Sequence, residues 1–458
     1  MKRISYATLL VALIVAASGC TTTTTNAPTN AANTNATTPT NATPAATPSP
    51  TASPGATASD TGEAGLPLTL PVLDAMFADS SFAGALKAKL QLSNEQVESL
   101  RKIAREETSK LSEKEAGSGT TSAATRDAAE KIKGVVGEEK LAAFTAFVRE
   151  RWSDGAGALP SKPNSVPTDT RVVVNAPAFR MDVFENGQLV KTYKVGIGYP
   201  EFPLPQGVRK AEQIIFNPAW TPPDEPWVKG KVQPGEKIEA GNKLNPLGPI
   251  KIPIGLPSLI HGGKHPWRLG QFASHGCVGL TSPMVQDFAL LLAQASGTKL
   301  TPEDVAAYAK NPSETQAVKL ANTVPVELRY ETIVVEDGRL HVYRDVYDKG
   351  TNTEENLRRV LETYGVRIED LSEQERAQAL DALQQMARDA HGNPSRDSGA
   401  TPKGKSKSGN VTYNVKGDKE VVIEVAALRG KGYPAPVNLM PAPTPTPEAS
   451  APKKKKGK

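Results

Sequence analysis

The residues best suited to chemistry gather between positions 261 and 277. This stretch holds three of the five histidines and one of the two cysteines of the 458-residue chain, namely His261, His265, His275 and Cys277. A cysteine thiol is mostly protonated at neutral pH, so a nucleophilic thiol needs a neighbouring imidazole or dipole. The imidazole in turn needs an acceptor for its second ring nitrogen, and a carbonyl beside a glycine can serve. Backbone N–H groups at a His-Gly-Cys turn can face a developing oxyanion. These residue types therefore predict thiol acyl transfer.

A metal site is the alternative interpretation of the same side chains, because three imidazoles and a thiol could supply four zinc ligands. Gly262, Gly263 and Pro266 disfavour a helix across this part of the chain. Without a helix, the spacing of His261 and His265 does not place both imidazoles on one face. We therefore favour a thiol nucleophile and expect no metal site.

The segment before this stretch has helical spacing. Residues 66–155 are rich in alanine and charged side chains, and Ser93 with Gln96 forms a candidate capping box. The segment contains neither histidine nor cysteine, so we expect a helical domain with a spacer or docking role.

The segment that contains the stretch is predicted to be a mostly-β domain spanning residues 170–348. Its apolar residues alternate with period two, and Asn186-Gly187 indicates a hairpin turn. Ser282 as cap and Pro283 at the first position predict one helix after the cysteine. Residues 349–440 predict a further helical segment, from about 354 to 389, and a late strand or hairpin.

The two ends of the chain have the composition of targeting and linker segments. Residues 1–19 have a basic start, an apolar run and small residues before Cys20, as in a secretory signal. A cysteine in this position resembles a bacterial lipobox, in which the thiol is acylated, so we expect Cys20 to carry a lipid. Residues 20–65, rich in Thr, Ala, Asn and Pro, and the Pro- and Lys-rich residues 441–458 predict disordered linkers. The chain is therefore expected to be exported and anchored to a membrane at the periplasmic or cell-envelope face.

Charge and cysteine content exclude several classes of protein. The formal net charge is +5, but the surplus lies in Lys2, Arg3 and the lysines of the last six residues. A nucleic-acid interface needs basic residues on a folded face, so no nucleic-acid partner is expected. Two cysteines are too few for a disulfide scaffold or a cysteine-ligated iron–sulfur centre.

The middle of the chain closely resembles the L,D-transpeptidase catalytic domain (YkuD-type) family. The family signature is a His-Gly, a lid-like loop, and then Ser/Thr-His-Gly-Cys. Here it corresponds to His261-Gly262 and Ser274-His275-Gly276-Cys277. Further motifs follow the family order across about residues 170–347, including Val195-Gly-Ile-Gly198, Pro203-x-Pro-x-Gly207, Asn217-Pro-x-Trp220 and Asn245-Pro-Leu-Gly248. The resemblance implies a β-sandwich of the YkuD type with one helix after the cysteine.

The resemblance also implies a role for individual residues. Cys277 would be the nucleophile and His261 the general base, oriented by the carbonyl of Gly262. Amides around His275, Gly276 and Cys277 would form the oxyanion hole, with Ser274 and the His275 side chain supporting the loop. Trp220, Trp267 and Arg268 are candidates for substrate binding.

Gly279 is the one departure from the family pattern. The family usually has Arg or Asn at this position, two residues after the cysteine, where it helps to hold the substrate peptide. Arg268 or Lys264 in the lid-like loop could substitute for it.

The implied function is that of a peptidoglycan L,D-transpeptidase. Cys277 would attack a stem tetrapeptide, release D-alanine, and pass the acyl group to an amine of another stem or of a wall-attached protein. No cofactor is required, and carbapenem-type β-lactams would acylate the thiol. Two alternatives remain: hydrolysis of the same bond as an L,D-carboxypeptidase, and a non-catalytic lipoprotein that binds the wall.

Overall fold

The computed structural model describes residues 66, 68–111, 118–153, 162–223, 228, 232–255, 258–395 and 411–439. The predicted signal, the lipid anchor at Cys20, the linker 20–65 and the tail 441–458 lie outside these ranges. Within them, every helix is too short or too polar to cross a membrane.

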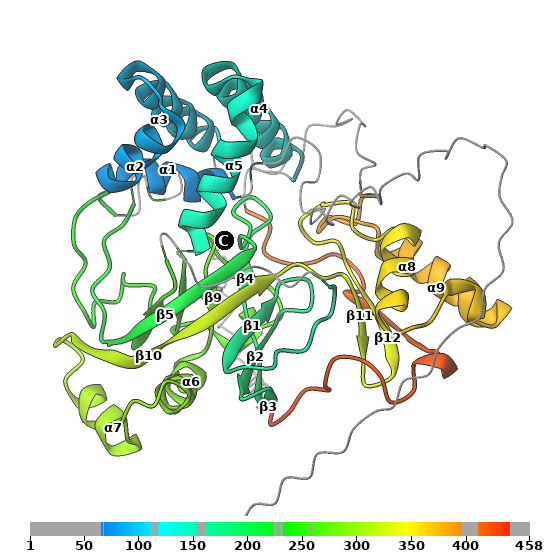
Figure 1. Ribbon diagram of the computed structural model, residues 1–458. Helices are drawn as coiled ribbons and strands as arrows, with labels where there is room; N and C mark the ends of the chain where they lie inside the picture. Colours follow the sequence, from blue (N-terminus) through cyan, green and yellow to red (C-terminus); the bar gives the residue numbers. More distant parts are fainter. Residues whose placement is uncertain are drawn as a thin grey trace, which may run out of the picture. The chain divides into compact units, whose positions relative to one another are not determined.

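The predicted helical segment is confirmed by helices that occupy most of residues 70–153 (Figure 1). The third of them begins at the predicted capping box, in which the Gln96 amide donates to Ser93 Oγ and the Ser93 amide donates to the Gln96 side chain. Phe77, Leu86 and Phe144 are fully buried in the apolar core. The helices are α1 (Leu70–Ala78), α2 (Ser80–Leu90), α3 (Asn94–Ser109), α4 (Ser118–Val136) and α5 (Glu138–Ser153).

A mixed sheet of eight strands follows, and the prediction of a mostly-β domain is confirmed. The strand order is β3-β2-β1-β10-β5-β6-β7-β9, and a further parallel pair is formed by β4 and β8. Asn186 and Gly187 have φ of 49° and 82° between β2 and β3, as a type I′ hairpin turn requires. The strands are β1 (Arg171–Asn175), β2 (Arg180–Glu185), β3 (Gln188–Lys194), β4 (Ile197–Gly198), β5 (Gly207–Phe216), β6 (Ile250–Pro253), β7 (Leu259–His261), β8 (Phe272–Ser274), β9 (Val278–Gly279) and β10 (Gln316–Arg329).

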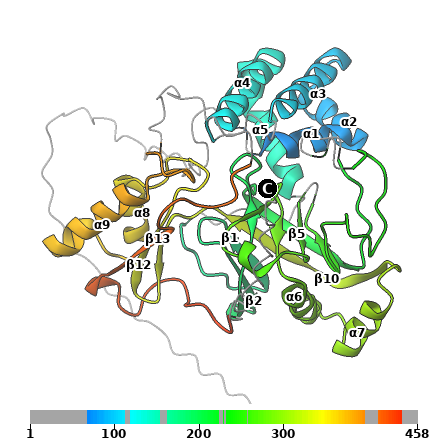
Figure 2. The ribbon, with the colours of Figure 1, turned by 180° about the vertical axis from the view of Figure 1, so that it is seen from behind.

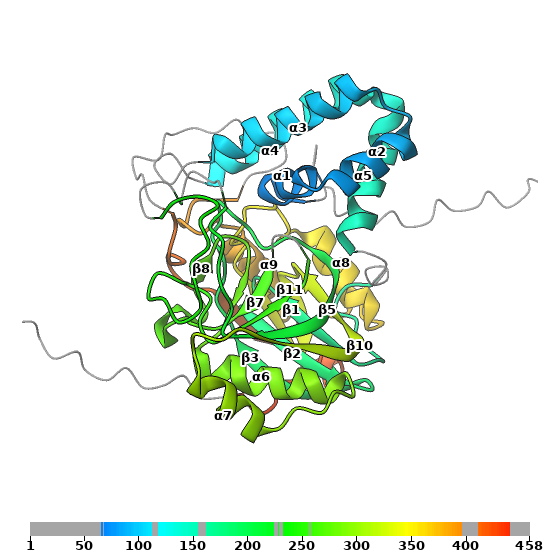
Figure 3. The ribbon, with the colours of Figure 1, turned by 90° about the vertical axis from the view of Figure 1, so that its left-hand side faces the viewer.

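The helix predicted after the cysteine is α6 (Ser282–Ala295), and it packs against β6 and β10 (Figure 3). Its cap differs from the prediction: Thr281 precedes the helix, and its Oγ1 accepts from the Met284 amide. Ser282 lies inside the first turn because the residue before it has the extended backbone of a cap. A second helix, α7 (Pro302–Lys310), leads into β10.

The C-terminal part forms a smaller module with its own core (Figure 2). Its antiparallel sheet has the order β11-β12-β13, covered by α8 and α9. The helical segment predicted from about 354 to 389 is two helices, with a turn at Gly365 (φ 67°) between them. The hairpin β11–β12 pairs with β13 instead of the large sheet, so the predicted boundary at residue 348 does not coincide with this module. The elements are β11 (Ile333–Glu336), β12 (Arg339–Tyr343), α8 (Glu354–Thr363), η2 (Ile368–Asp370), α9 (Glu373–Met386), β13 (Glu420–Glu424) and η3 (Ala426–Leu428).

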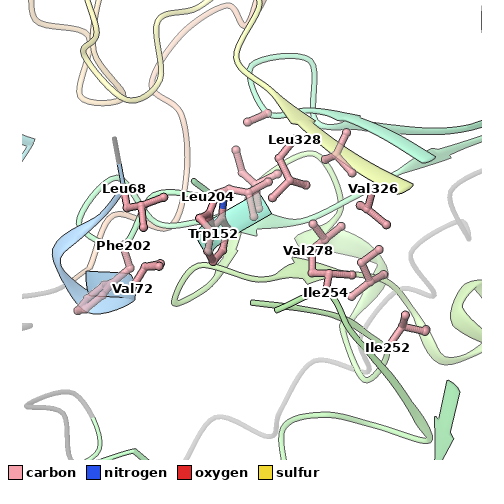
Figure 4. Close-up of a cluster of buried hydrophobic side chains, with 14 of the residues drawn as sticks. Leu68, Val72, Trp152, Phe202, Leu204, Ile252, Ile254, Val278, Val326 and Leu328 are labelled. Carbon is pink, nitrogen blue, oxygen red and sulfur yellow. The ribbon is translucent and has the colours of Figure 1, made fainter. Parts of the chain in front are cut away.

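Trp152, at the end of α5, contacts the start of β5. Its indole Nε1 donates to the Gln206 carbonyl at 3.0 Å, and the Arg209 guanidinium carbon lies 3.2 Å from the ring centroid. Figure 4 shows Trp152 in a cluster with Leu204 and other buried apolar side chains. This aromatic anchor gives the helices a defined contact with the sheet.

Candidate active site

Two neighbouring strands bring His261 and Cys277 together. Strand β7 ends at His261, and β9 starts directly after Cys277. The strands are parallel, with Ile260 opposite Val278 and His261 opposite Gly279. Residues separated by the long loop between the strands therefore share one edge of the sheet.

The His261 imidazole is buried, and its Nδ1 lies 2.8 Å from the carbonyl oxygen of Gly262. A carbonyl can only accept, so Nδ1 carries the proton and Nε2 is left as the basic nitrogen. Burial, reinforced by the positive charge of Lys264, lowers the pKa of His261 to about 3. The carbonyls of Gly262 and Leu247 oppose this shift. The resting imidazole is therefore neutral, with the orientation that the sequence predicts.

The Cys277 thiol is half-buried in the same region. Burial raises the pKa of this thiol, while a hydrogen bond from the Leu259 backbone and the charge of Lys264 lower it in part. A neutral thiol and a neutral imidazole on neighbouring strands suit general-base catalysis, in which the proton moves to the imidazole as sulfur attacks.

Serine side chains fix the turn before the nucleophile. Ser274 Oγ donates to the Cys277 carbonyl at 2.6 Å and accepts from the Cys277 amide at 2.9 Å. Ser258 Oγ donates to the Gly276 carbonyl at 2.9 Å, and Gly276 has a φ of 91°, which favours glycine. The predicted supporting role of Ser274 thus has a structural basis. The Cys277 amide, predicted as an oxyanion donor, instead donates to Ser274, because the serine lies three residues earlier in the same tight turn.

The amides of His275 and Gly276 stay the predicted donors to an oxyanion. The His275 ring packs edge-on against Tyr199 and Phe202, with centroids 5.0 and 4.7 Å away. This packing gives the His275 side chain contacts that can support the turn.

The three candidate substrate-binding residues lie on two different loops. Trp267 and Arg268 belong to η1 (Pro266–Arg268), within the lid loop, defined here as residues 262–271. Trp267 is 65% exposed and stacks on His265 with ring centroids 4.2 Å apart. Trp220 lies on another loop, where its backbone pairs with Ile238. The common role of Trp220, Trp267 and Arg268 in substrate binding stays a prediction.

The segment before β13 contributes a residue that the sequence patterns did not indicate. The Arg268 guanidinium carbon lies 4.4 Å from the ring centroid of Tyr413, whose ring is also edge-on to Tyr199 at 5.5 Å. Lys419 Nζ donates to the Gly270 carbonyl at 2.6 Å. The lid loop is therefore held at two points by residues far along the chain.

The alternative interpretation of the three histidines and Cys277 is that they bind a metal ion. Among the residues that the structure describes, no group of three or more His, Cys, Asp or Glu side chains is arranged to hold a metal ion.

Residues 169–312 match the family model YkuD, described as the L,D-transpeptidase catalytic domain. The predicted family resemblance is confirmed for this segment. The matched region starts within one residue of the predicted domain and ends in the loop before β10. It contains His261, the lid loop and Cys277.

Solved structures of L,D-transpeptidases are also similar to parts of the chain. The catalytic domain from Enterococcus faecium has 16% identity and a TM-score of 0.24, covering 36% of this chain and 100% of its own. The Mycobacterium smegmatis enzyme has 17% identity and a TM-score of 0.21, covering 35% and 58%. An enzyme from Mycobacterium tuberculosis has 15% identity and a TM-score of 0.20, covering 35% and 57%. For a structure of a mutant Enterococcus faecium L,D-transpeptidase, with 13% identity and a TM-score of 0.22, the chain spans about half of that protein's length. No curated protein matched the chain.

Proposed function

We propose that this protein is a peptidoglycan L,D-transpeptidase that acts through a Cys277 thioester. The observation that carries the proposal is the His261 imidazole, oriented by Gly262 on the strand next to the cysteine, within a segment that matches the family model. The substrate class follows from the family, which acts on peptidoglycan stem peptides.

The reaction has two halves that return the enzyme to its starting state. As Sγ of Cys277 attacks the carbonyl carbon before the terminal D-alanine, the thiol proton passes to Nε2 of His261. The C–N bond then breaks, the leaving amine takes that proton, and a thioester remains. An acceptor amine attacks the thioester, gives its proton to His261, and the thiol forms again as the C–S bond breaks.

The acceptor in the second half defines the outcome. An amine of another stem or of a wall-attached protein gives a cross-link or a modified wall, whereas water gives an L,D-carboxypeptidase. A neutral His261 can accept a proton from either nucleophile. We propose the amine as acceptor, with hydrolysis as the alternative.

The test compares wild type with Cys277→Ala in the processing of tetrapeptide muropeptides, followed by mass spectrometry. The wild type is expected to release D-alanine and form dimers, and the variant to do neither. Glu303→Gln, on the exposed start of α7, serves as a matched control that should retain activity. Identical processing by wild type and Cys277→Ala would overturn the proposal, and intact wall binding in both would then favour the non-catalytic alternative.

Acylation of the thiol gives a second test that needs no acceptor. A carbapenem is expected to add its mass to the Cys277 peptide of the wild type. Modification elsewhere, or none, would contradict the assignment of Cys277 as nucleophile.

We also propose that the protein is a lipoprotein exported to the cell envelope and anchored through Cys20. The support is the order of basic, apolar and small residues in the first twenty positions. Labelling with a radioactive fatty acid is expected to mark wild type and not Cys20→Ala. Equal labelling of both proteins would overturn the anchor.

A further inference from the structure

The side chain of Lys264 occupies the space beside Gly279. A Cβ atom at Gly279 would lie 2.7 Å from Cγ and 2.9 Å from Cε of Lys264, closer than such atoms approach in proteins. Unlike Gly276, Gly279 does not have a positive φ, so its backbone does not itself require glycine. Glycine is needed here for space, and the lysine fills that space.

The backbones of both residues are held in place. The Gly279 amide and carbonyl exchange hydrogen bonds with Gly196 at 2.8 and 2.9 Å. The Lys264 amide donates to the Leu280 carbonyl at 3.0 Å. The lysine stem therefore runs along β9, the strand that starts directly after Cys277.

The Lys264 ammonium acts on both groups of the proposed reaction. Its charge lowers the pKa of His261 and lowers that of the Cys277 thiol. Burial lowers the pKa of Lys264 itself to about 8; the Cys277 thiolate opposes this shift and Arg268 adds to it. The charged and titratable groups that act in this set are His261 on β7, Cys277 before β9, and Arg268 on η1.

We propose that Lys264, whose side chain packs against Gly279, is a positioning residue. It stabilises the Cys277 thiolate and the anionic charge that develops as the thiol reacts. This rests on the proposed role of Cys277 as nucleophile. A partly buried cation favours an adjacent anion because water screens the pair less than it does at the open surface. Lys264 thus supplies from the lid loop a cation that no side chain at position 279 provides.

Alkylation of Cys277 by iodoacetamide tests this without any transpeptidase substrate. The rate is measured against pH on the full-length protein, by mass spectrometry of the Cys277 peptide, with Cys277→Ala as the blank. Lys264→Met is expected to move the profile to higher pH by about one unit, so that alkylation near neutral pH slows about tenfold. Lys264→Arg should retain part of the effect. A Lys264→Met profile that coincides with the wild type would overturn the proposal.

A double-mutant cycle tests whether the Lys264 side chain occupies the space beside Gly279. Gly279→Ala is expected to destabilise the protein where Lys264 is present and much less in the Lys264→Ala background, because the steric overlap is then gone. The Lys264→Ala and double variants should share one alkylation profile, displaced from the wild type. Equal destabilisation by Gly279→Ala in both backgrounds would show that the lysine does not occupy this space.

The outcomes separate this inference from the proposed function. A shifted alkylation profile together with no muropeptide processing by the wild type would retain the role of Lys264 and reject the transpeptidase. Normal muropeptide processing by the wild type, together with an unchanged alkylation profile in Lys264→Met, would retain the transpeptidase and reject the role of Lys264.

Discussion

The active-site group of His261, Lys264 and Cys277 differs from a second buried group, around Arg180, in how its charges are balanced. Arg180 lies between two buried carboxylates: it forms an ion pair with Asp182 at 2.8 Å and another with Glu336. Its Nη2 donates to the Pro434 carbonyl at 3.0 Å. Desolvation tends to lower the pKa of Arg180, but the two carboxylates outweigh it and the net pKa is raised. Burial also raises the pKa values of Asp182 and Glu336, so in this group only the arginine is shifted towards its charged form.

In the active site, the shifts of all three groups favour the neutral forms. Burial lowers the pKa values of His261 and Lys264 and raises that of Cys277. Buried ions that are paired hold structure together, whereas buried groups pushed towards neutrality near physiological pH are ready to exchange protons. The Arg180 group joins the C-terminal module to the large sheet through its pair with Glu336, whereas the pKa shifts of the His261 group support its proposed catalytic role.

The largest effect is expected when the base is removed. His261→Gln keeps a side chain that can donate to Gly262 but cannot take the thiol proton. We expect kcat for the tetrapeptide to fall by about 10²–10⁴, the usual contribution of a general base. Urea denaturation should change far less than activity. A variant with near-normal kcat would mean that another group serves as base.

Removal of the Arg180 guanidinium should lower the stability of the folded protein. Arg180→Met leaves Asp182 and Glu336 buried without their partner, and the free energy of unfolding is expected to fall by about 3–5 kcal/mol. Lys102→Met, in a solvent-exposed ion pair on α3, is the control that should change little. Urea denaturation measures both. A small effect of Arg180→Met would remove the distinction between the two groups.

Acid should destabilise the folded protein through His261. The pKa of this side chain is about 3 in the folded protein and about 6.5 when unfolded, so between these values the unfolded chain binds the additional proton. Stability is therefore lost as the pH falls from about 6.5 towards 3, by at most about 1.4 kcal/mol per pH unit from this residue. Urea denaturation across this range should be less pH-dependent in His261→Gln. An equal slope in both proteins would place the acid sensitivity elsewhere.

The smallest effect tests whether the two groups are independent, since residues 411–439 contact the Arg180 group and also the lid loop that contains Lys264. Tyr433 donates to Asp182 at 3.2 Å, and Tyr413 packs on Arg268 of the lid loop. Tyr413→Ala removes a partly exposed cation–π contact and should cost about 0.5–1 kcal/mol. Hydrogen exchange is expected to increase in the lid loop and not around Arg180. An increase at both places would show that residues 411–439 couple them.

Local signals predicted the fold best. The capping box of Ser93 and Gln96 and the turn at Asn186-Gly187 depend on residues within a few positions of each other, and both are present. The alternation of apolar residues in β11–β12 continues that of the preceding strands, and it therefore predicts that this hairpin belongs to the catalytic domain. Its pairing with β13 depends on a segment much later in the chain, which periodicity does not show.

The same distinction holds within the site. The contact between His261 and Gly262 joins consecutive residues, and the His-Gly-Cys turn is continuous in sequence, so both could be predicted. The Ser274 hydroxyl accepts a hydrogen bond from the Cys277 amide because of the way the turn closes. Residue types alone do not determine this geometry.

The amino-acid sequence by itself determined the chemistry: a single internal thiol, an imidazole that a neighbouring carbonyl can orient, and the family motifs around them. The tertiary structure alone decided what surrounds that chemistry, namely Lys264 in the space beside Gly279 and Tyr413 against Arg268. These contacts join residues with no shared local pattern. They exist because the chain closes β7 onto β9 and brings the C-terminal segment back to the lid loop, where packing and burial set the pKa values.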